Sequence, residues 1–170
     1  NNLLEPIRNH FKDNKDAIVC DHLKEDIIFS DVSFSYNKNS AVLNNLSFKI
    51  STNSLVGIVG KTGVGKTTLI KLLLRLYEVG SGKILIGNNN INNIKLESLR
   101  KNIALVSQET FLFDGTIADN ISYPNLDADL EKIKKVAKLS QCDEFIDKFP
   151  NGYDAIIGER GQRLSVGQKQ

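Results

Sequence analysis

Hydrophobic and polar residues alternate along the first part of the chain with the period of a β-strand. Over residues 27–36 a period of two places four side chains on one face: Ile28, Val32, Phe34 and Tyr36. A second β-rich run covers residues 42–50, and only a short polar stretch separates the two runs. Two antiparallel strands are therefore expected early in the chain.

The next stretch changes from a continuous apolar run to a helical pattern. Residues 55–59 are almost all apolar, which predicts a strand buried on both faces. After a glycine-rich segment, leucines recur at the spacing of one helix face: Leu69, Leu72, Leu73 and Leu76. The chain is organised around this strand, loop and helix.

The remaining pattern predicts shorter elements. Strands are expected at 83–86 and 103–106, and helices at 96–101, 117–121, 127–139 and 141–149, followed by an extended piece at 153–157. Thr116 and Asp127 are the expected caps of two of these helices. Glu131 and Lys135 are expected to form a favourable i,i+4 pair. This mixture of strands and helices predicts an α/β fold.

The glycine-rich segment 60–67 reads GKTGVGKT and fits the pattern G-x-x-x-x-G-K-[ST]. Its glycines let the backbone bend until successive N–H groups form a nest for anions, and the following helix adds the positive end of its dipole. Lys66 can reach the β- and γ-phosphates of a nucleotide, and the Thr67 hydroxyl can ligate Mg²⁺. The candidate phosphate-binding residues are Gly60, Lys61, Thr62, Gly63, Val64, Gly65, Lys66, Thr67 and Thr68. An ordinary glycine-rich turn is the alternative.

Composition narrows the class of protein. With 170 residues, 41% of them hydrophobic and 25% charged, the chain can form one globular domain with a core. A net charge of +2 is too small to indicate a nucleic-acid partner, and we expect none. No apolar run approaches the roughly 20 residues that span a bilayer. The two cysteines, Cys20 and Cys142, form neither a disulfide framework nor a metal motif.

Several further landmarks stand in a fixed order along the chain. LSVGQ at 164–168 matches a signature that is usually LSGGQ, with Val166 as the departure, and Gln108 follows a predicted strand. Tyr36 follows VSFS, and the runs VSQETFLFDGTIADNI and IIGERGQRLSVGQ surround Gln108 and the signature. Together they resemble the nucleotide-binding domain of ATP-binding cassette (ABC) transporters of the exporter type, from residue 27 to the end.

The resemblance implies a domain plan. It implies a P-loop NTPase-type core with an antiparallel β subdomain and a helical subdomain, incomplete at the C-terminus. Residues 26–170 then form the N-terminal part of the ATP-binding domain, and residues 1–25 form a linker from an upstream transmembrane domain. The expected cofactors are ATP and Mg²⁺. The expected location is the cytoplasmic face of a membrane, with a transmembrane domain, in the same chain or a separate one, as partner.

The resemblance also implies roles for single residues. Lys66 and Gln108 are expected to be catalytic, and Gln108 joins Thr67 as a ligand of Mg²⁺; a solvated loop glutamine is the alternative. Tyr36 is expected to stack on adenine, because every base offers a π face; a tyrosine packed on the sheet is the alternative. The signature residues are expected to bind the γ-phosphate held by the opposite subunit of a head-to-tail dimer: Ser165, Gly167 and Gln168. Simple helix capping by Ser165 is compatible with that role.

The apolar residues Phe111, Leu112 and Phe113 have two interpretations. They are either part of the core or, as the resemblance implies, an exposed groove that receives a short helix from the membrane domain, with Glu159 and Arg160 beside it.

The sequence ends before the Walker B aspartate, the catalytic glutamate and the switch histidine of the family. We therefore expect residues 1–170 by themselves to bind nucleotide weakly and not to hydrolyse it, because the attacking water lacks its base. A non-hydrolysing regulatory nucleotide-binding module is an alternative to an exporter ATPase. A different P-loop protein, such as a small-molecule kinase, is disfavoured by LSVGQ about 100 residues past the loop.

Overall fold

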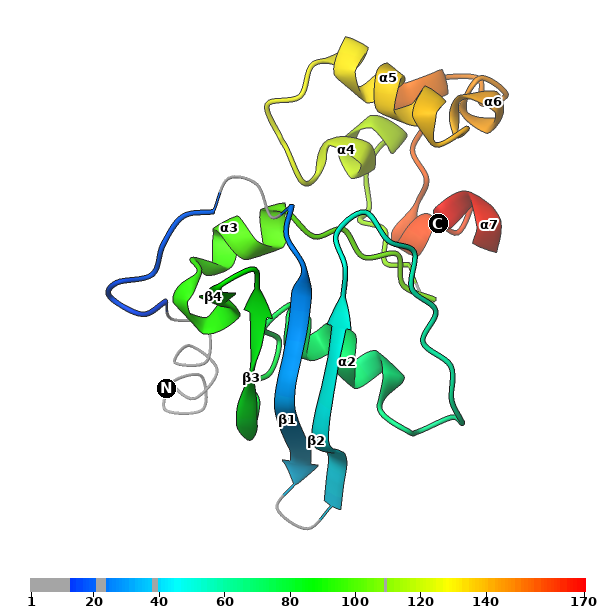
Figure 1. The fold of residues 1–170 in the computed structure, drawn as a ribbon. Helices are drawn as coiled ribbons and strands as arrows, with labels where there is room; N and C mark the ends of the chain where they lie inside the picture. Colours follow the sequence, from blue (N-terminus) through cyan, green and yellow to red (C-terminus); the bar gives the residue numbers. More distant parts are fainter. Residues whose placement is uncertain (1–12, 21–23, 38–39, 109) are drawn as a thin grey trace, which may run out of the picture. The chain divides into compact units, whose positions relative to one another are not determined.

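The computed structural model describes residues 13–20, 24–37, 40–108 and 110–170. The chain divides into two compact units, residues 1–104 and residues 105–170, which are described separately below. Figure 1 shows the strands in the first unit and a group of short helices in the second.

The first unit is built on a four-stranded sheet. Strands β1 (Ile27–Asn37) and β2 (Ser40–Ile50) pair antiparallel, which confirms the two early strands predicted from the sequence. On its other edge β1 pairs with β3 (Ser81–Ile86), and β3 pairs with the short β4 (Asn89–Asn90), both antiparallel. The strand order is therefore β2-β1-β3-β4 (Figure 1).

A bulge in β1 changes which of its side chains reach the core. Asp31 lies in the left-handed region at φ 51°, and the pairing register shifts between Phe29 and Val32. An extra residue at a bulge moves the strand's inward face by one position. Phe29, Val32 and Phe34 are buried as a result, so the predicted face that included Ile28 is wrong for that residue.

Helix α2 (Lys66–Leu73) covers this sheet. Its buried leucines Leu69 and Leu72 belong to the same apolar cluster as the inward side chains of β1. The cluster also receives residues from the segment that follows β4, which contains the 3₁₀ turn η1 (Ile91–Asn93) and helix α3 (Leu96–Lys101). Helix α3 has the bounds predicted from the sequence.

Two runs that the sequence predicts as buried strands are not strands. Residues 55–59 and 103–106 have no strand pairing, and Val59 and Val106 are 93% and 74% exposed. A strand that is buried on both faces needs hydrogen-bonded neighbours, and no described strand pairs with either run. An apolar hollow of 240 Å³ lies where Ile58 and Val59 face β2 and α2.

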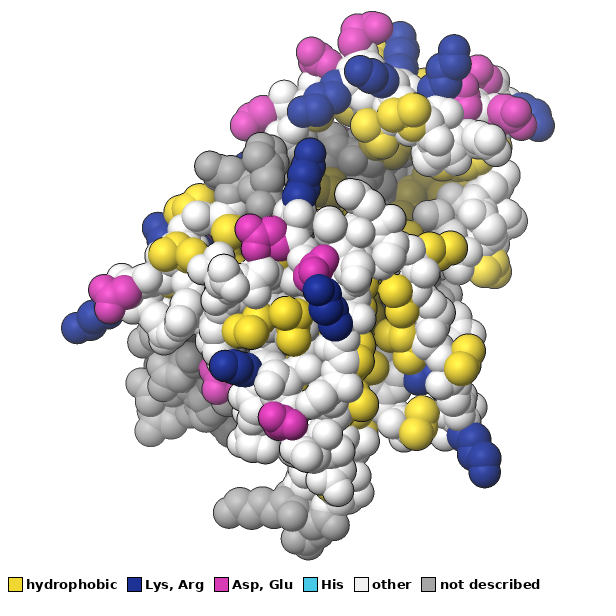
Figure 2. Space-filling view, in the orientation of Figure 1, with side chains coloured by type: hydrophobic (Ala, Val, Ile, Leu, Met, Phe, Trp, Pro, Cys, Tyr) yellow, Lys and Arg dark blue, Asp and Glu magenta, His cyan; other side chains and the backbone are white. Residues whose placement is uncertain are grey.

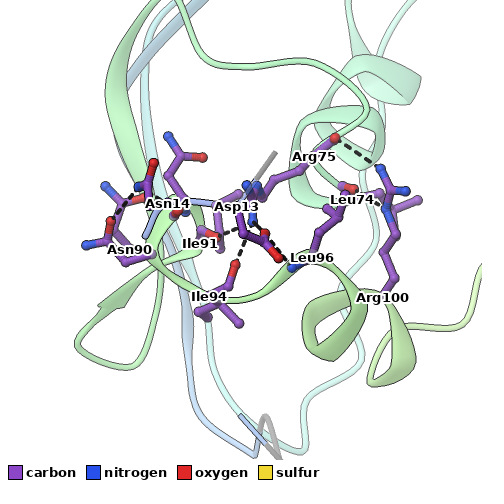
Figure 3. A network of polar contacts seen from close by, with 11 residues as sticks. Asp13, Asn14, Leu74, Arg75, Asn90, Ile91, Ile94, Leu96 and Arg100 are labelled. Carbon is purple, nitrogen blue, oxygen red and sulfur yellow. Dashed lines mark hydrogen bonds and ion pairs between the residues drawn. The ribbon is translucent and has the colours of Figure 1, made fainter. Parts of the chain in front are cut away.

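A buried arginine fixes the end of α2. Arg75 is 8% exposed, and its guanidinium donates hydrogen bonds to the backbone carbonyls of Ile91 (3.2 Å) and Ile94 (2.6 Å). Arg100 of α3 donates from the other side to the carbonyls of Leu74 and Arg75 (Figure 3). The chain that follows α2 is therefore tied to η1 and α3 by hydrogen bonds to buried backbone groups.

Residues 13–20 lie along the same part of the first unit. Asp13 accepts a hydrogen bond of 2.8 Å from the N–H of Leu96 at the start of α3, and its carboxylate lies 3.6 Å from the Arg75 guanidinium (Figure 3). Ile18 forms a parallel bridge with Ile94. The other residues of the expected linker, 1–12 and 21–23, lie outside the described part of the chain.

The second unit is helical around a small core. It contains α4 (Ile117–Ser122), α5 (Leu130–Leu139), α6 (Asp143–Ile146), the 3₁₀ turns η2 (Gly152–Asp154) and η3 (Glu159–Gly161), and α7 (Val166–Lys169). Five buried residues form its core: Ile117, Ala137, Ile146, Ala155 and Ile157. Figure 2 shows basic and acidic side chains mixed over α5 and α6, so neither charge dominates that face.

The helix caps show where the sequence predictions hold in this unit. Thr116 caps α4 as predicted, in a reciprocal capping box with Asp119. The cap of α5 is Asp129 and not Asp127, because the Asp129 carboxylate accepts the N–H of Lys132 at 2.8 Å. The predicted cap was therefore two residues early.

Two other predictions for this unit are corrected. Glu131 pairs with Lys134 at 3.4 Å and not with Lys135. The helix expected over 141–149 is reduced to α6, because Gln141 lies in the left-handed region at φ 59° and turns the chain just before it. No helix in the described parts of the chain is long and apolar enough to cross a membrane.

Candidate functional site

The glycine-rich loop turns sharply into α2 at two left-handed residues. Gly63 and Gly65 have φ values of 83° and 103°, a region that only glycine enters without strain. A Cβ atom on Gly65 would lie 2.8 Å from Leu43 Cδ2 and 3.2 Å from Val42 Cγ1. The sequence therefore needs glycine at position 65 both for the turn and for the close approach of the loop to β2.

The first turn of α2 presents free backbone donors. Gly65 is the N-cap residue and has no side chain, so no side-chain acceptor satisfies the first N–H groups of the helix. These donors and the positive end of the helix dipole favour an anion at this end. Thr67 lies exposed in the same turn, and the loop residues Lys61, Thr62 and Val64 are exposed as well.

Lys66 lies across its own loop. Its ammonium donates to the carbonyl oxygens of Gly60 and Lys61, each at 2.8 Å. The long, flexible side chain is therefore held over the loop by two acceptors. A phosphate bound by the loop amides would meet this positive charge once the flexible side chain turns from the two carbonyls toward it.

The donor groups near the loop suit a metal ion that is carried mainly by a substrate. In the described residues no three His, Cys, Asp or Glu side chains come together as a metal site. The Thr67 hydroxyl supplies a neutral oxygen ligand in the first turn of α2. Mg²⁺ prefers oxygen ligands and is commonly held by few protein groups together with substrate phosphates. The residues present therefore fit Mg²⁺ bound with a nucleotide.

Tyr36 stands at the end of β1, beside α2. Its hydroxyl lies 3.1 Å from the Oγ1 atom of buried Thr68, the second residue after Lys66. Its ring packs edge-on against Phe34, with centroids 4.9 Å apart, yet the side chain remains 43% exposed. Tyr36 thus packs against its own sheet and keeps an exposed aromatic surface near the loop, whereas its stacking on adenine stays a prediction.

Two residues that sequence reasoning missed complete this aromatic group. The Tyr77 ring packs against Tyr36 at a centroid distance of 5.1 Å, and the Lys71 ammonium lies over both rings at 5.6 and 5.9 Å. Thr68 and Lys71 are three positions apart on α2, so helical spacing would have placed them on one face. Tyr77 gave no such signal, because it lies beyond the helix.

Gln108 belongs to the second unit. It is exposed, in a segment without helix or strand. The expectation that it directly follows a strand is wrong, since 103–106 is not a strand. Its exposed amide offers both a hydrogen-bond donor and an acceptor.

The signature segment forms a capped helix tip in the second unit. The Ser165 hydroxyl accepts the N–H of Gln168 at 3.3 Å, and the Gln168 amide oxygen accepts the N–H of Ser165 at 2.9 Å. Leu164 packs on the core of the unit, whereas Ser165, Val166 and Gly167 are exposed. The predicted helix start at Ser165 is confirmed. Because the hydroxyl only accepts in this cap, its own proton is available to a ligand.

The apolar residues 111–113 divide between core and surface. Leu112 packs with the core of the second unit, so the core interpretation holds for it. Phe111 is 65% exposed, and Phe113 stacks on exposed Tyr123 with ring centroids 4.1 Å apart. Phe111, Phe113 and Tyr123 therefore form an exposed aromatic cluster, and its role as a groove for another domain stays a prediction.

Comparison with known proteins agrees with these features. Residues 43–170 match the family described as "ABC transporter". ABC transporter B family member 29, chloroplastic, of Arabidopsis thaliana is 49% identical over 158 residues, which cover 91% of this chain and 25% of the relative. Iron-sulfur clusters transporter ATM1, mitochondrial, of Candida albicans is 45% identical over 148 residues, 87% of this chain and 20% of the relative.

A solved structure shows the same fold. A bacterial Atm1-family ABC exporter with ATP bound superposes with a TM-score of 0.87 at 36% identity, over 93% of this chain and 28% of that chain. The chain therefore spans 20% to 28% of the length of these three proteins.

Proposed function

Since this chain belongs to the ABC transporter family, as an ATP-binding component of exporters, we propose that it binds Mg·ATP and, in the complete protein, hydrolyses it to drive export. The observation that carries the proposal is Lys66 held across a glycine loop whose backbone donors lead into α2. The small-molecule kinase considered from the sequence is excluded by the family match over residues 43–170.

The triphosphate lies along residues 60–68 in this proposal. The loop amides and the first turn of α2 donate to phosphate oxygens, and the Lys66 ammonium neutralises charge on the β- and γ-phosphates. Adenine stacks on the exposed surface of Tyr36, a contact that is worth about 1–3 kcal/mol for each base. In this proposal the loop binds any triphosphate, and Tyr36 adds affinity for the base.

The Thr67 hydroxyl would be a neutral oxygen ligand of Mg²⁺, and Gln108, in the second unit, stays a ligand predicted from the sequence. Mg²⁺ would supply positive charge that offsets the negative charge developing on the phosphate oxygens. Gln108 also orients the attacking water in this proposal, because its amide both donates and accepts without repelling phosphate.

The exposed helix tip of α7 supplies the second half of the site. In a head-to-tail dimer, the Ser165 hydroxyl and the Gly167 backbone donate to the γ-phosphate bound by the opposite subunit, while Gln168 keeps the tip capped. The capping box supports this role, because it fixes the tip and leaves the Ser165 proton free. The second subunit, identical to the first in a homodimer, is therefore part of each complete site.

The names of the relatives support a membrane partner. The matched relatives are named as transporters, and this chain covers a fraction of each. We infer a transmembrane domain upstream of residue 26, in the same chain or a separate one, with the present residues at the cytoplasmic face. The exposed aromatic surface of Phe111, Phe113 and Tyr123 is the proposed contact for a short helix of that domain.

The test is ATP binding and turnover by the complete protein. Lys66→Ala should lower ATP affinity by at least about tenfold and abolish turnover, since it removes the charge at the phosphates. Lys138→Ala removes an exposed lysine of α5 and serves as the matched control, with no change expected. Equal ATP affinity and turnover in the two variants would refute the proposal.

A further inference from the structure

Lys71 and Tyr77 surround the ring of Tyr36. The Lys71 ammonium lies 5.6 Å from the Tyr36 centroid and 5.9 Å from the Tyr77 centroid, both within the range of a cation–π contact. The two tyrosine rings meet almost at right angles, at 88° and 5.1 Å, the edge-to-face arrangement that aromatic pairs prefer. One positive charge is therefore shared by two rings that are themselves in contact.

The turn that ends α2 brings Tyr77 back beside Lys71. The N–H of Leu76 donates to the Lys71 carbonyl and the N–H of Arg75 to the Leu72 carbonyl, each at 2.9 Å, with Arg75 left-handed at φ 49°. These bonds form a Schellman motif, which reverses the chain at the helix end. The buried guanidinium of Arg75 then fixes the turn through the carbonyls shown in Figure 3. Tyr77 therefore follows directly after a turn that hydrogen bonds hold in place.

Tyr36 is tied to α2 at two points. Its hydroxyl is paired with Thr68, next to the Thr67 of the loop, and its ring lies against Lys71, one helical turn further on. A side chain that is 43% exposed would otherwise lose rotamer freedom when a base stacks on it. A ring that is already held avoids part of that entropic cost, so the contacts raise affinity without touching the ligand.

We propose that Lys71, with Tyr77, is a positioning residue for the base of a nucleotide: it orders the Tyr36 ring for stacking and has no role in holding the phosphates. This rests on the proposed nucleotide site. It predicts that Lys71 contributes to binding affinity only when the ligand carries a base. A nucleoside triphosphate depends on Lys71, whereas inorganic triphosphate, which has no base to stack, does not.

The experiment compares two ligands on the complete protein. Dissociation constants are measured by titration calorimetry for Mg·ATP and for magnesium tripolyphosphate. Lys71→Met keeps an unbranched apolar stem without the charge. It should lower the affinity for ATP by about two- to fivefold, which corresponds to the free energy of an exposed cation–π contact. Its tripolyphosphate affinity should stay unchanged. Lys71→Arg restores the cation and should restore ATP affinity. Lys138→Met on α5 is the matched control and should change neither constant.

The possible outcomes separate this inference from the function on which it rests. If Lys71→Met binds ATP as the wild type does while Tyr36→Ala binds it more weakly, the role of Lys71 is overturned and the nucleotide site stands. Equal losses for ATP and tripolyphosphate in Lys71→Met also overturn it, because the lysine then acts on the phosphates or on the fold. If the wild type binds neither ligand, the proposed function itself fails.

Discussion

The Lys66 ammonium donates a 2.8 Å hydrogen bond to the carbonyl oxygen of Gly60, at the opposite end of the loop. This bond closes the loop on itself, because it ties the first residue of α2 back to the first residue of the loop. The loop and its lysine therefore act as one structural unit, and its geometry is sensitive to substitutions that leave the lysine in place.

Gly65→Ala should disrupt that unit. The new Cβ would lie 2.8 Å from Leu43 Cδ2 at a φ of 103°, so it adds both a clash and backbone strain of about 1–3 kcal/mol. We expect nucleotide affinity to fall at least tenfold, because the first turn of α2 must shift. Gly57→Ala is the control, since its Cβ meets nothing within 4 Å. Calorimetric titration with ATP measures both variants, and equal affinities would contradict the prediction.

Arg75→Ala should destabilise the first unit. It removes the donor to the buried carbonyls of Ile91 and Ile94, and a buried group that loses a charged partner costs about 2–4 kcal/mol. Urea unfolding of the wild type and the variant measures the loss. Asp13→Ala removes the partly exposed partner at 3.6 Å and the acceptor of the Leu96 N–H, and should cost only about 1 kcal/mol. The prediction fails if the two variants are equally stable.

Ser165→Ala should reduce hydrolysis beyond its effect on stability. Loss of the cap on α7 costs about 1 kcal/mol, and so does loss of the cap on α5 in Asp129→Ala. Only Ser165 has a proposed contact with the γ-phosphate of the partner subunit. We therefore expect ATP turnover to fall at least tenfold in Ser165→Ala and to stay within about twofold in Asp129→Ala. Similar turnover in the two variants would show that Ser165 is only a cap.

The capping box of α4 should depend on pH. The Thr116 hydroxyl and then its backbone N–H donate to the Asp119 carboxylate and lower its pKa from the usual value. A lowered folded-state pKa stabilises the fold above the unfolded pKa, about 3.9, and the stabilisation is lost as the pH falls through the folded value. Asp119→Asn should therefore be less stable than the wild type at pH 7, with the difference shrinking as the pH falls through the lowered pKa of the folded state.

Unfolding measured against pH tests this prediction. Asp127→Asn is its control, because Asp127 caps no helix in the structure. A constant difference between Asp119→Asn and the wild type from pH 7 to pH 3 would exclude the carboxylate as its source.

The elements that the sequence predicted correctly are those that local rules determine. The glycine loop, the strands β1 and β2, helix α3 and the Thr116 cap follow from residues a few positions apart. The runs 55–59 and 103–106 failed because a buried strand is defined by its neighbours, and their apolar residues say nothing about which strand pairs with them.

Other features could not be predicted because tertiary contacts decide them. The bulge at Asp31 changes the inward face of β1 without a glycine to mark it. Tyr77 joins Tyr36 only because a buried arginine holds the turn after α2. The proposed roles of Gln108 and Ser165 depend on a bound nucleotide and a second subunit, which helical and strand periodicity do not encode.

The account depends most directly on where the triphosphate lies. A crystal structure of the complete protein with a non-hydrolysable Mg·ATP analogue measures this. We predict phosphate oxygens within hydrogen-bonding distance of the backbone N–H groups of residues 63–67, with the Lys66 ammonium turned from the Gly60 carbonyl toward the β- and γ-phosphates. A structure at saturating analogue in which Lys66 still binds Gly60 and the triphosphate lies elsewhere would contradict the account.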